Sequence, residues 1–202
     1  MAINLGSMSN FGENKGQVLN LEKNSILDLT KKNPGLKKVI LGAGWDISKG
    51  GDSFDLDIAA FLLDKNEKFN TVDNIIFFNN KVSKGIALEG DNRTGVGNGD
   101  DERINIDLSQ IDSEICKIVF VVSIDKAREK RQTFGMIDNS YVRLLDVENN
   151  EKEICRFNLK ENGSTATSII FANLYRDGQE WQFKALGEGM IADLNGVLGL
   201  YQ

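Results

Sequence analysis

The sequence contains no histidine, and this absence excludes several classes of function. Histidine is the commonest general base in enzymes and the commonest protein ligand of zinc, copper and non-haem iron. Sites built on imidazole are therefore excluded. Cysteine is scarce too: Cys116 and Cys155 are the only two, and both lie in apolar runs. We expect both to be buried thiols and not part of a disulfide framework.

Long apolar segments are also lacking. Uninterrupted apolar runs such as Ile118 to Val122 are far shorter than the ~20 residues that a membrane-spanning helix needs. The first seven residues have neither a basic leader nor a long apolar stretch, so we expect no secretory signal. These features predict a cytoplasmic protein with no direct membrane insertion. Residues 1–14 are predicted to be a poorly ordered lead-in or insertion, and residues 15–202 a single domain.

The charge is concentrated in one part of the chain. The formal net charge is -6, and the segment from Asp46 to Glu102, with twelve acidic and six basic residues, carries all of it. A phosphate backbone binds to basic surfaces, so nucleic acid is not an expected partner. Cations are the expected partners of this segment.

Short runs of β-branched and aromatic residues recur along the chain and predict about ten strands. Gly, Asn and Asp between them, and the turn at Asn33-Pro34-Gly35, favour an all-β fold, an antiparallel β-sandwich, over a parallel α/β fold. The predicted strands are Ile26–Leu29, Leu36–Leu41, Phe54–Leu63, Asn74–Phe78, Ile104–Leu108, Ile118–Ile124, Tyr141–Val147, Ile154–Leu159, Ser168–Tyr175 and Trp181–Leu186. The last two are predicted to form a hairpin across residues 176–179.

Helix is expected in one or two short pieces. Residues 125–133 contain good helix formers, and Asp125 is the predicted N-cap. A second short helix is predicted near residues 190–200.

Two carboxylates share one face at the start of the third predicted strand. Residues alternate in direction along a strand, so Asp55 and Asp57 point away from Phe54, Leu56 and Ile58. Later in the same strand the carboxylate face becomes apolar at Phe61 and Leu63, which places the two acids at the wet end. Such neighbouring carboxylates raise each other's pKa unless a cation compensates them. The alternative is a solvated strand end that keeps the protein soluble.

The second acidic feature is a glycine-rich loop, residues 89–102, which ends in three consecutive acids. Calcium takes ~6–8 oxygen ligands, and glycines let a loop turn its carbonyls inward. Side-chain oxygens are available from Asp91, Asn92, Asp100, Asp101 and Glu102. The loop is not an EF-hand, because Arg93 and Val96 stand at the third and sixth positions. The alternative is a charged surface loop without an ion. Asp46, Asn79 and Asn80 are further oxygen donors at predicted strand ends.

These motifs, in this order, resemble the TerD family of tellurite-resistance and stress proteins. The similarity runs from about Lys15 to the C-terminus. It is carried above all by Gly42-Ala43-Gly44-Trp45-Asp46, Phe54-Asp55-Leu56-Asp57, and Gly90-Asp91-Asn92-Arg93-Thr94-Gly95 with Gly99-Asp100-Asp101-Glu102. One departure is that residues 6–14 look inserted.

The resemblance implies a TerD-like β-sandwich that holds calcium, as two ions, in acidic loops at one end. The residues that it implies for the metal sites are Asp46, Asp55, Asp57, Asp91, Asn92, Asp100, Asp101 and Glu102. It also implies a cytoplasmic stress setting, with other tellurite-resistance proteins at a membrane-associated complex as partners. The expected function is calcium-ordered protein–protein interaction, with no catalytic residues and no enzymatic activity.

Two other functions remain open from sequence. A divalent-metal-dependent hydrolase could use the same acids to activate water, although no nucleophile motif accompanies them. A cyclic-nucleotide receptor, a role described for some members of the family, could use Arg93, Arg128, Arg131 or Arg143 on a phosphate, although we expect these arginines to be solvated or structural. Direct chemistry on tellurite at the cysteines is disfavoured by their expected burial.

Overall fold

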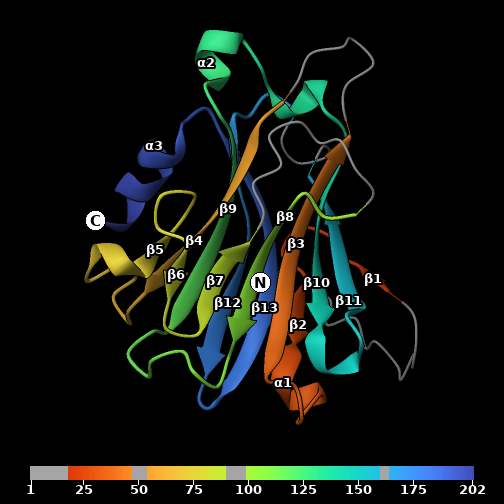
Figure 1. Ribbon diagram of the computed structural model, residues 1–202, viewed down its shortest axis with the longest axis vertical. Helices are drawn as coiled ribbons and strands as arrows, with labels where there is room; N and C mark the ends of the chain where they lie inside the picture. The colour runs from red at the N-terminus through yellow and green to blue at the C-terminus, as the bar shows by residue number, and fades with distance from the viewer. Residues whose placement is uncertain (1–17, 47–53, 90–98, 160–163) are drawn as a thin grey trace, which may run out of the picture.

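The structure is a computed structural model and describes residues 18–46, 54–89, 99–159 and 164–202. Two β-sheets pack face to face, as expected for the predicted β-sandwich (Figure 1). Sheet A has seven strands in the order β1 (Leu19–Asn20), β11 (Lys152–Asn158), β10 (Asp138–Asp146), β3 (Lys38–Asp46), β8 (Glu102–Asp107), β7 (Ile86–Glu89) and β6 (Val82–Ser83). Sheet B has six, in the order β2 (Ile26–Asp28), β13 (Glu180–Met190), β12 (Ser168–Asp177), β9 (Lys117–Ile124), β4 (Leu56–Leu63) and β5 (Ile75–Ile76).

All strand pairs are antiparallel except the one at the edge of sheet A, where β1 runs parallel to β11. The predicted hairpin across residues 176–179 is confirmed: β12 and β13 pair from Asp177 and Glu180 onward, with Gly178 in the left-handed region at φ +66°. Strands β1, β6 and β7 were not predicted; they are only two, two and four residues long, and runs this short give a weak periodic signal.

The core lies between the sheets and is built from the alternate residues of each strand. In β4, Leu56, Ile58, Ala60 and Leu62 face this interior. The opposite face of β4 confirms the predicted change from acid to apolar, since Phe61 and Leu63 belong to a second apolar cluster on the outside of sheet B. This sandwich therefore has apolar packing on both faces of sheet B.

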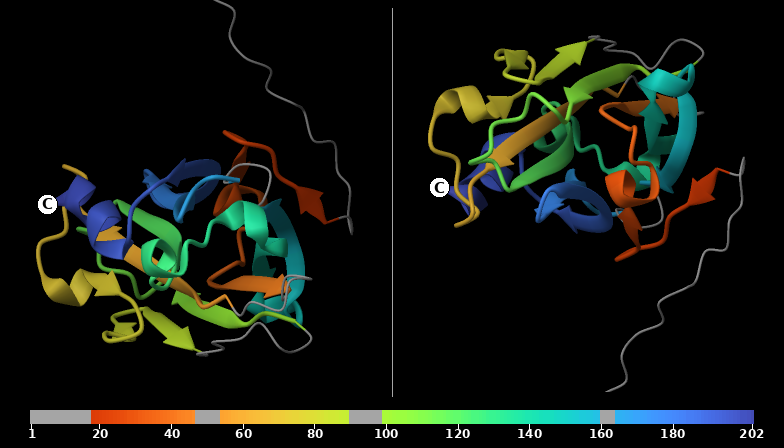
Figure 2. Two further views of the ribbon diagram at one scale, coloured as in Figure 1. Left: turned by 90° about the horizontal axis from the view of Figure 1, so that it is seen from above. Right: turned by 90° about the horizontal axis from the view of Figure 1, so that it is seen from below.

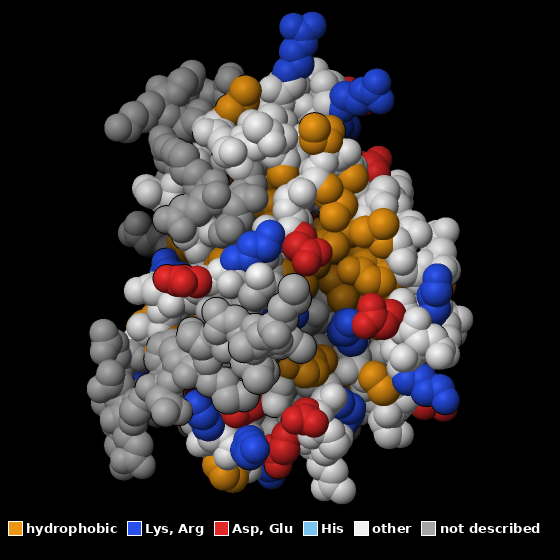
Figure 3. Space-filling view, turned by 180° about the vertical axis from the view of Figure 1, so that it is seen from behind, with side chains coloured by type: hydrophobic (Ala, Val, Ile, Leu, Met, Phe, Trp, Pro, Cys, Tyr) orange, Lys and Arg blue, Asp and Glu red, His pale blue; other side chains and the backbone are white. Residues whose placement is uncertain are grey.

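A short C-terminal helix covers part of that outer face. It comprises α3 (Leu194–Leu198) and the 3-10 turn η4 (Gly199–Tyr201), which together match the helix predicted near residues 190–200. Val197 is fully buried there, and the Tyr201 ring meets Phe61 edge-on at 5.9 Å. Apolar side chains still reach the surface on this rear side of the molecule (Figure 3). Leu186 and Met190 are partly buried members of the same cluster.

The helix predicted over residues 125–133 is shorter than expected. Only α2 (Ala127–Lys130) is helical, and Lys126, in the left-handed region, precedes it in place of the predicted cap Asp125. The Asp125 carboxylate is instead within 3.8 Å of the Lys126 ammonium and 3.5 Å of the Lys130 ammonium. A further short helix, α1 (Leu29–Lys32), lies between β2 and the predicted turn. The remaining 3-10 turns are η1 (Val72–Asn74), η2 (Phe134–Met136) and η3 (Val147–Asn149).

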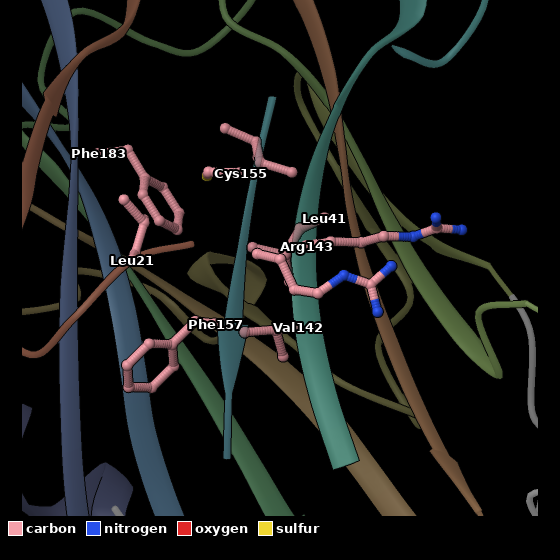
Figure 4. A pocket seen from close by; sticks show the side chains of 9 residues that line it. Leu21, Leu41, Val142, Arg143, Cys155, Phe157 and Phe183 are labelled. Carbon is pink, nitrogen blue, oxygen red and sulfur yellow. The ribbon is translucent and has the colours of Figure 1, made fainter. Parts of the chain in front are cut away.

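The two cysteines have different environments. Cys155 is buried on β11 as expected, and Figure 4 shows it beside apolar side chains that include Leu21 and Phe183. The expectation that Cys116 is also buried was wrong: it lies just before the first residue of β9 and is partly exposed. Apolar neighbours in the sequence therefore do not ensure that a thiol is buried.

Candidate functional site

The acidic segments converge at one end of the sandwich. The end of β3 lies there together with the starts of β4, β8 and β10, because β3 runs antiparallel to both β8 and β10. Figure 2 gives this end from above. A hydrogen bond from the Trp45 indole N–H to the carbonyl of Phe54, at 3.2 Å, joins the two sheets at this end. The fold thus brings together segments that are far apart in the sequence, such as Trp45 and Asp101, which are 56 positions apart and joined by a hydrogen bond.

Asp46 is the last residue of β3 and pairs through its Cα with Asp138 of β10. Asp138 was not among the residues predicted from the sequence. It becomes visible as a neighbour only through the register of these two strands, which spacing along the chain does not show.

Asp55 and Asp57 lie where the alternation predicted, at the start of β4 and half-buried. Asp57 pairs through its Cα with Ser123 of β9, and the carbonyl of Asp55 accepts a hydrogen bond from the Asp125 N–H at 2.8 Å. The carboxylates of this pair therefore lie on the outer face of sheet B, at the same end as the other acids.

Glu102 is buried, with 3% of its surface exposed. It lies on the inward face of β8, in line with Ile104 and Ile106. Its Oε2 accepts a hydrogen bond of 2.7 Å from the backbone N–H of Ile58 in β4, so the side chain connects the two sheets. A buried carboxylate is stabilised by such a donor, since its unpaired desolvation would cost several kcal/mol.

Asp101 faces the end of β3. Its Oδ2 accepts a hydrogen bond from the Trp45 backbone N–H at 3.0 Å, and its own N–H donates to the carbonyl of Ala43 at 2.8 Å. Together these two bonds extend the pairing of β3 and β8 beyond the last ladder position.

Asp100 has a different set of partners, on the outer face of sheet A. Its Oδ1 accepts a 2.7 Å hydrogen bond from Nε of Arg143, and the Tyr141 hydroxyl is 3.4 Å from the same oxygen. Its Oδ2 is 3.8 Å from Nε of Arg103, and its side chain is only 3% exposed. Asp100 is therefore already neutralised by arginines of this chain.

Two glycines of β3 make room for this arrangement. A Cβ on Gly42 would be 2.3 Å from Cγ of Asp100, and one on Gly44 would be 2.6 Å from Cζ of Tyr141. The glycines alternate with Ala43 and Trp45, which point into the core. The sequence Gly42-Ala43-Gly44-Trp45 thus gives a strand with apolar side chains on its inner face and no side chains on its outer face.

The arginines continue as a network across sheet A. Glu153 accepts hydrogen bonds from Arg156 at 2.7 Å and from Arg143 at 3.1 Å, and the Arg156 guanidinium lies 4.1 Å from the centre of the Tyr141 ring. The bonds from Arg156, followed by those from Arg143, lower the pKa of Glu153 below its ordinary value although burial acts in the opposite direction. Arg143, which the sequence offered as a possible phosphate-binding residue, belongs to this network.

Burial raises the pKa of the Tyr141 hydroxyl, and the negative charge of Asp100 raises it further. For Arg143, burial alone would lower the pKa of the guanidinium, but the bonds to Asp100 and Glu153 raise it above its ordinary value. Both side chains consequently keep their protons, and with them their donor roles, through the neutral range.

Two predicted site residues, Asp91 and Asn92, lie outside the described residues, as does most of the glycine-rich loop. Within the described ranges no group of three or more Asp, Glu or Cys side chains is close enough to hold a metal ion. The donors that the structure does bring to this end are carboxylate oxygens, the type that hard cations prefer. Asp101 and Glu102 carry oxygens of this type and so fit such an ion by the chemistry of their donors.

Asn80 is not part of this group. Its side-chain amide donates to the carbonyl of Ile75 at 2.8 Å and holds the turn after β5. No helix in the part of the chain that is described combines the length and the apolar character needed to cross a bilayer.

The profile of the TerD domain matches residues 18–201. The chain belongs to the TerD family. It is 41% identical over 186 residues to the tellurium resistance protein TerD of Serratia marcescens, an alignment that covers 91% of this chain and 96% of that protein.

Other TerD relatives are named for stress. The chain is 43% identical over 175 residues to general stress protein 16U of Bacillus subtilis (strain 168), covering 85% of this chain and 90% of that protein. Among solved structures, a homologue of the telluride resistance protein TerD from Streptomyces coelicolor A3(2) superposes with a TM-score of 0.68, covering 81% of this chain and 96% of that chain at 23% identity. That last likeness supports the fold of the TerD domain and nothing finer.

Proposed function

We propose that this TerD-family chain is a calcium-binding module that acts in resistance to tellurite and other chemical stress. The observation that supports the proposal is that the strand ends carrying Asp55, Asp57, Asp101 and Glu102 lie at the same end of the sandwich. Asp91 and Asn92 would add oxygens from the adjoining loop, and Asp46 from the end of β3. In this proposal the protein binds and does not catalyse.

A divalent ion would add positive charge beside these carboxylates. Neighbouring carboxylates repel one another, and a bound cation offsets that repulsion and so stabilises the fold. We infer that two calcium ions order the acidic end. The ordered end then contacts other tellurite-resistance proteins at a membrane-associated complex.

The decisive experiment is thermal unfolding in calcium and in EDTA. At a free concentration of ~100 Kd, calcium adds roughly 2.7 kcal/mol to the free energy of unfolding, which raises the midpoint by about 5–10 °C in a chain of this size. Magnesium is expected to do less, because it requires a tighter octahedral site. An unchanged midpoint at millimolar calcium would defeat the proposal.

The matched variants are Asp57→Asn and Asp73→Asn. Both remove one negative charge from the same acidic segment, but Asp73 is an exposed residue of η1, away from the converging strand ends. Asp57→Asn is expected to abolish most of the calcium-induced shift, and Asp73→Asn to retain it. Equal shifts in the two variants would mean that calcium acts only by general screening.

A test of the partner function uses the same pair. Cross-linking in cells challenged with tellurite is expected to capture other tellurite-resistance proteins with the wild type and with Asp73→Asn, and fewer with Asp57→Asn. Capture that is the same for all three chains would separate partner binding from the acidic end.

A further inference from the structure

The middle of β3 has no side chain at the point where two arginines face each other. Gly42 pairs with Arg143 of β10 on one side and with Arg103 of β8 on the other. Residues at one register position project to the same face of a sheet, so the two guanidinium groups border a gap over a residue without a Cβ. Two like charges so placed would repel each other unless an anion lay between them.

Asp100 is that anion. Its carboxylate occupies the space over Gly42, with Oδ1 at 2.7 Å from Nε of Arg143 and Oδ2 at 3.8 Å from Nε of Arg103. The Tyr141 hydroxyl lies 3.0 Å from the carbonyl of Gly99 and 3.4 Å from Oδ1 of Asp100. It therefore contacts both the backbone of Gly99 and the carboxylate of Asp100. The side chain of Asp100 is 3% exposed.

The next two residues along the chain are directed elsewhere. Asp101 reaches the backbone N–H of Trp45, and Glu102 reaches that of Ile58 in the other sheet. Fixing Asp100 therefore fixes the piece of backbone from which these two carboxylates project.

We propose that Tyr141 and Arg143 are positioning residues for the acidic end. They hold Asp100 as an internal counter-ion that docks the start of β8 on sheet A, and Asp100 is not itself a ligand of the metal. This inference rests on the calcium-binding function proposed above and divides the predicted acids into two groups. A carboxylate already paired with arginine gains little from a second cation, and leaving the pair would cost the partly buried Arg143 one of its two carboxylate partners.

The experiment measures two quantities on the full chain. Thermal unfolding in excess EDTA reports how firmly the segment is docked without metal. Titration calorimetry with calcium chloride reports the number of ions bound per chain and their Kd. The variants are Asp100→Asn, which removes the charge of the counter-ion, and Gly42→Ala, which displaces the Asp100 carboxylate without removing any acidic residue from the chain. Asp57→Asn serves as the comparison for a proposed ligand.

The docking role predicts that Asp100→Asn and Gly42→Ala both lower the midpoint in EDTA by about 6 °C or more, as loss of one partner of a buried ion pair does. Both are expected to bind as many calcium ions as the wild type, with a Kd weakened about 3- to 10-fold. Asp57→Asn is expected to show the reverse, with a midpoint in EDTA that is unchanged or higher and calcium binding weakened more than about 10-fold.

The inference is overturned if Asp100→Asn binds fewer ions per chain, or if its midpoint in EDTA equals that of the wild type. Should both variants be too unstable to titrate, Tyr141→Phe removes only the hydroxyl and keeps the ring over Gly44. It is expected to weaken the Kd without changing the number of ions, and an unchanged Kd counts against positioning. If the wild-type chain binds no calcium, the proposed function is wrong, and the positioning role is wrong with it. The midpoints in EDTA would then still decide whether Asp100 is an internal counter-ion.

Discussion

The thiol of Cys155 shows what burial does to a single group in this protein. Burial raises its pKa to about 12, so at pH 8 only about one molecule in ten thousand carries the reactive thiolate. Its surroundings are apolar side chains of both sheets, while the neighbouring Arg143 side chain points away toward the outer face (Figure 4). Cys116, by contrast, is partly exposed.

We therefore predict that a chromogenic disulfide reagent at pH 8 titrates one thiol per native chain and both thiols in 6 M guanidinium chloride. In Cys116→Ser the native chain is expected to titrate none. Rapid reaction of native Cys116→Ser would show that Cys155 is accessible and that its burial has been misplaced.

The sequence predicts well which face of a strand a residue points to. It predicts poorly which residues that side chain contacts. Alternation correctly separated Asp55 and Asp57 from Leu56 and Ile58, because direction along a strand depends only on neighbouring residues. It could not show that Asp100 pairs with Arg143, which is 43 positions away, since that contact depends on strand register. Asp138 was missed for the same reason.

Strand β3 is the element on which the outer face of sheet A depends. Its glycines carry no side chain outward, and Tyr141 lies directly over Gly44. Glycine is normally unfavourable within a strand. Here that cost is offset by contacts over the glycines that a methyl group would prevent.

We predict that Gly44→Ala lowers the free energy of unfolding by about 1–3 kcal/mol, because the added Cβ would be 2.6 Å from Cζ of Tyr141 and forces the ring to move. In a Tyr141→Ala background the same change is expected to cost less than about 0.5 kcal/mol, which denaturant melts of the four chains can measure as a double-mutant cycle. Gly35→Ala is the control, since a methyl group there meets no atom within 4 Å. Additive effects of the two substitutions would mean that the ring and Gly44 are not in contact.

Short elements show the limits of local patterns. The run of helix formers at residues 126–131 predicted a longer helix than α2, which ends where Arg131 enters the left-handed region at φ 54°. The carbonyls of Ala127 and Arg128 accept hydrogen bonds from the Arg131 N–H at that end. Helix propensity amounts to only tenths of a kcal/mol per residue, so the chain direction required by the neighbouring strands outweighs it.

For the molecule as a whole, the fold class could be predicted because many short strands each gave the same signal. Ten expected strands have counterparts among the thirteen that the described residues form, and the two sheets follow from their length and spacing. The assembly of the acidic end could be expected only through resemblance to the family. Composition alone left it open whether the acids bind a cation or simply face water.

Acid should destabilise the molecule partly through Glu153. Its pKa is lowered from 4.5 in the folded chain, so the protonated form is relatively favoured in the unfolded chain. The stability that Glu153 contributes is complete above about pH 4.5 and is lost as the pH falls through the lower, folded-state pKa. We predict that Glu153→Gln costs stability at pH 6 and that its difference from the wild type shrinks toward pH 3. Denaturant melts across this range would test it, with exposed Glu114→Gln as the control. A difference that stays constant with pH would show that the charge of Glu153 contributes nothing.

The space over Gly42 also has a bearing on how this chain can change by descent. Because a methyl group at position 42 and a carboxylate at position 100 claim the same volume, neither position can mutate freely while the other stays fixed. A lineage that exchanged the glycine would first have to shorten or lose the acid, and would then be left with two opposed arginines and no anion between them. The order of substitutions at positions 42, 100, 103 and 143 is thus constrained by the geometry of one strand.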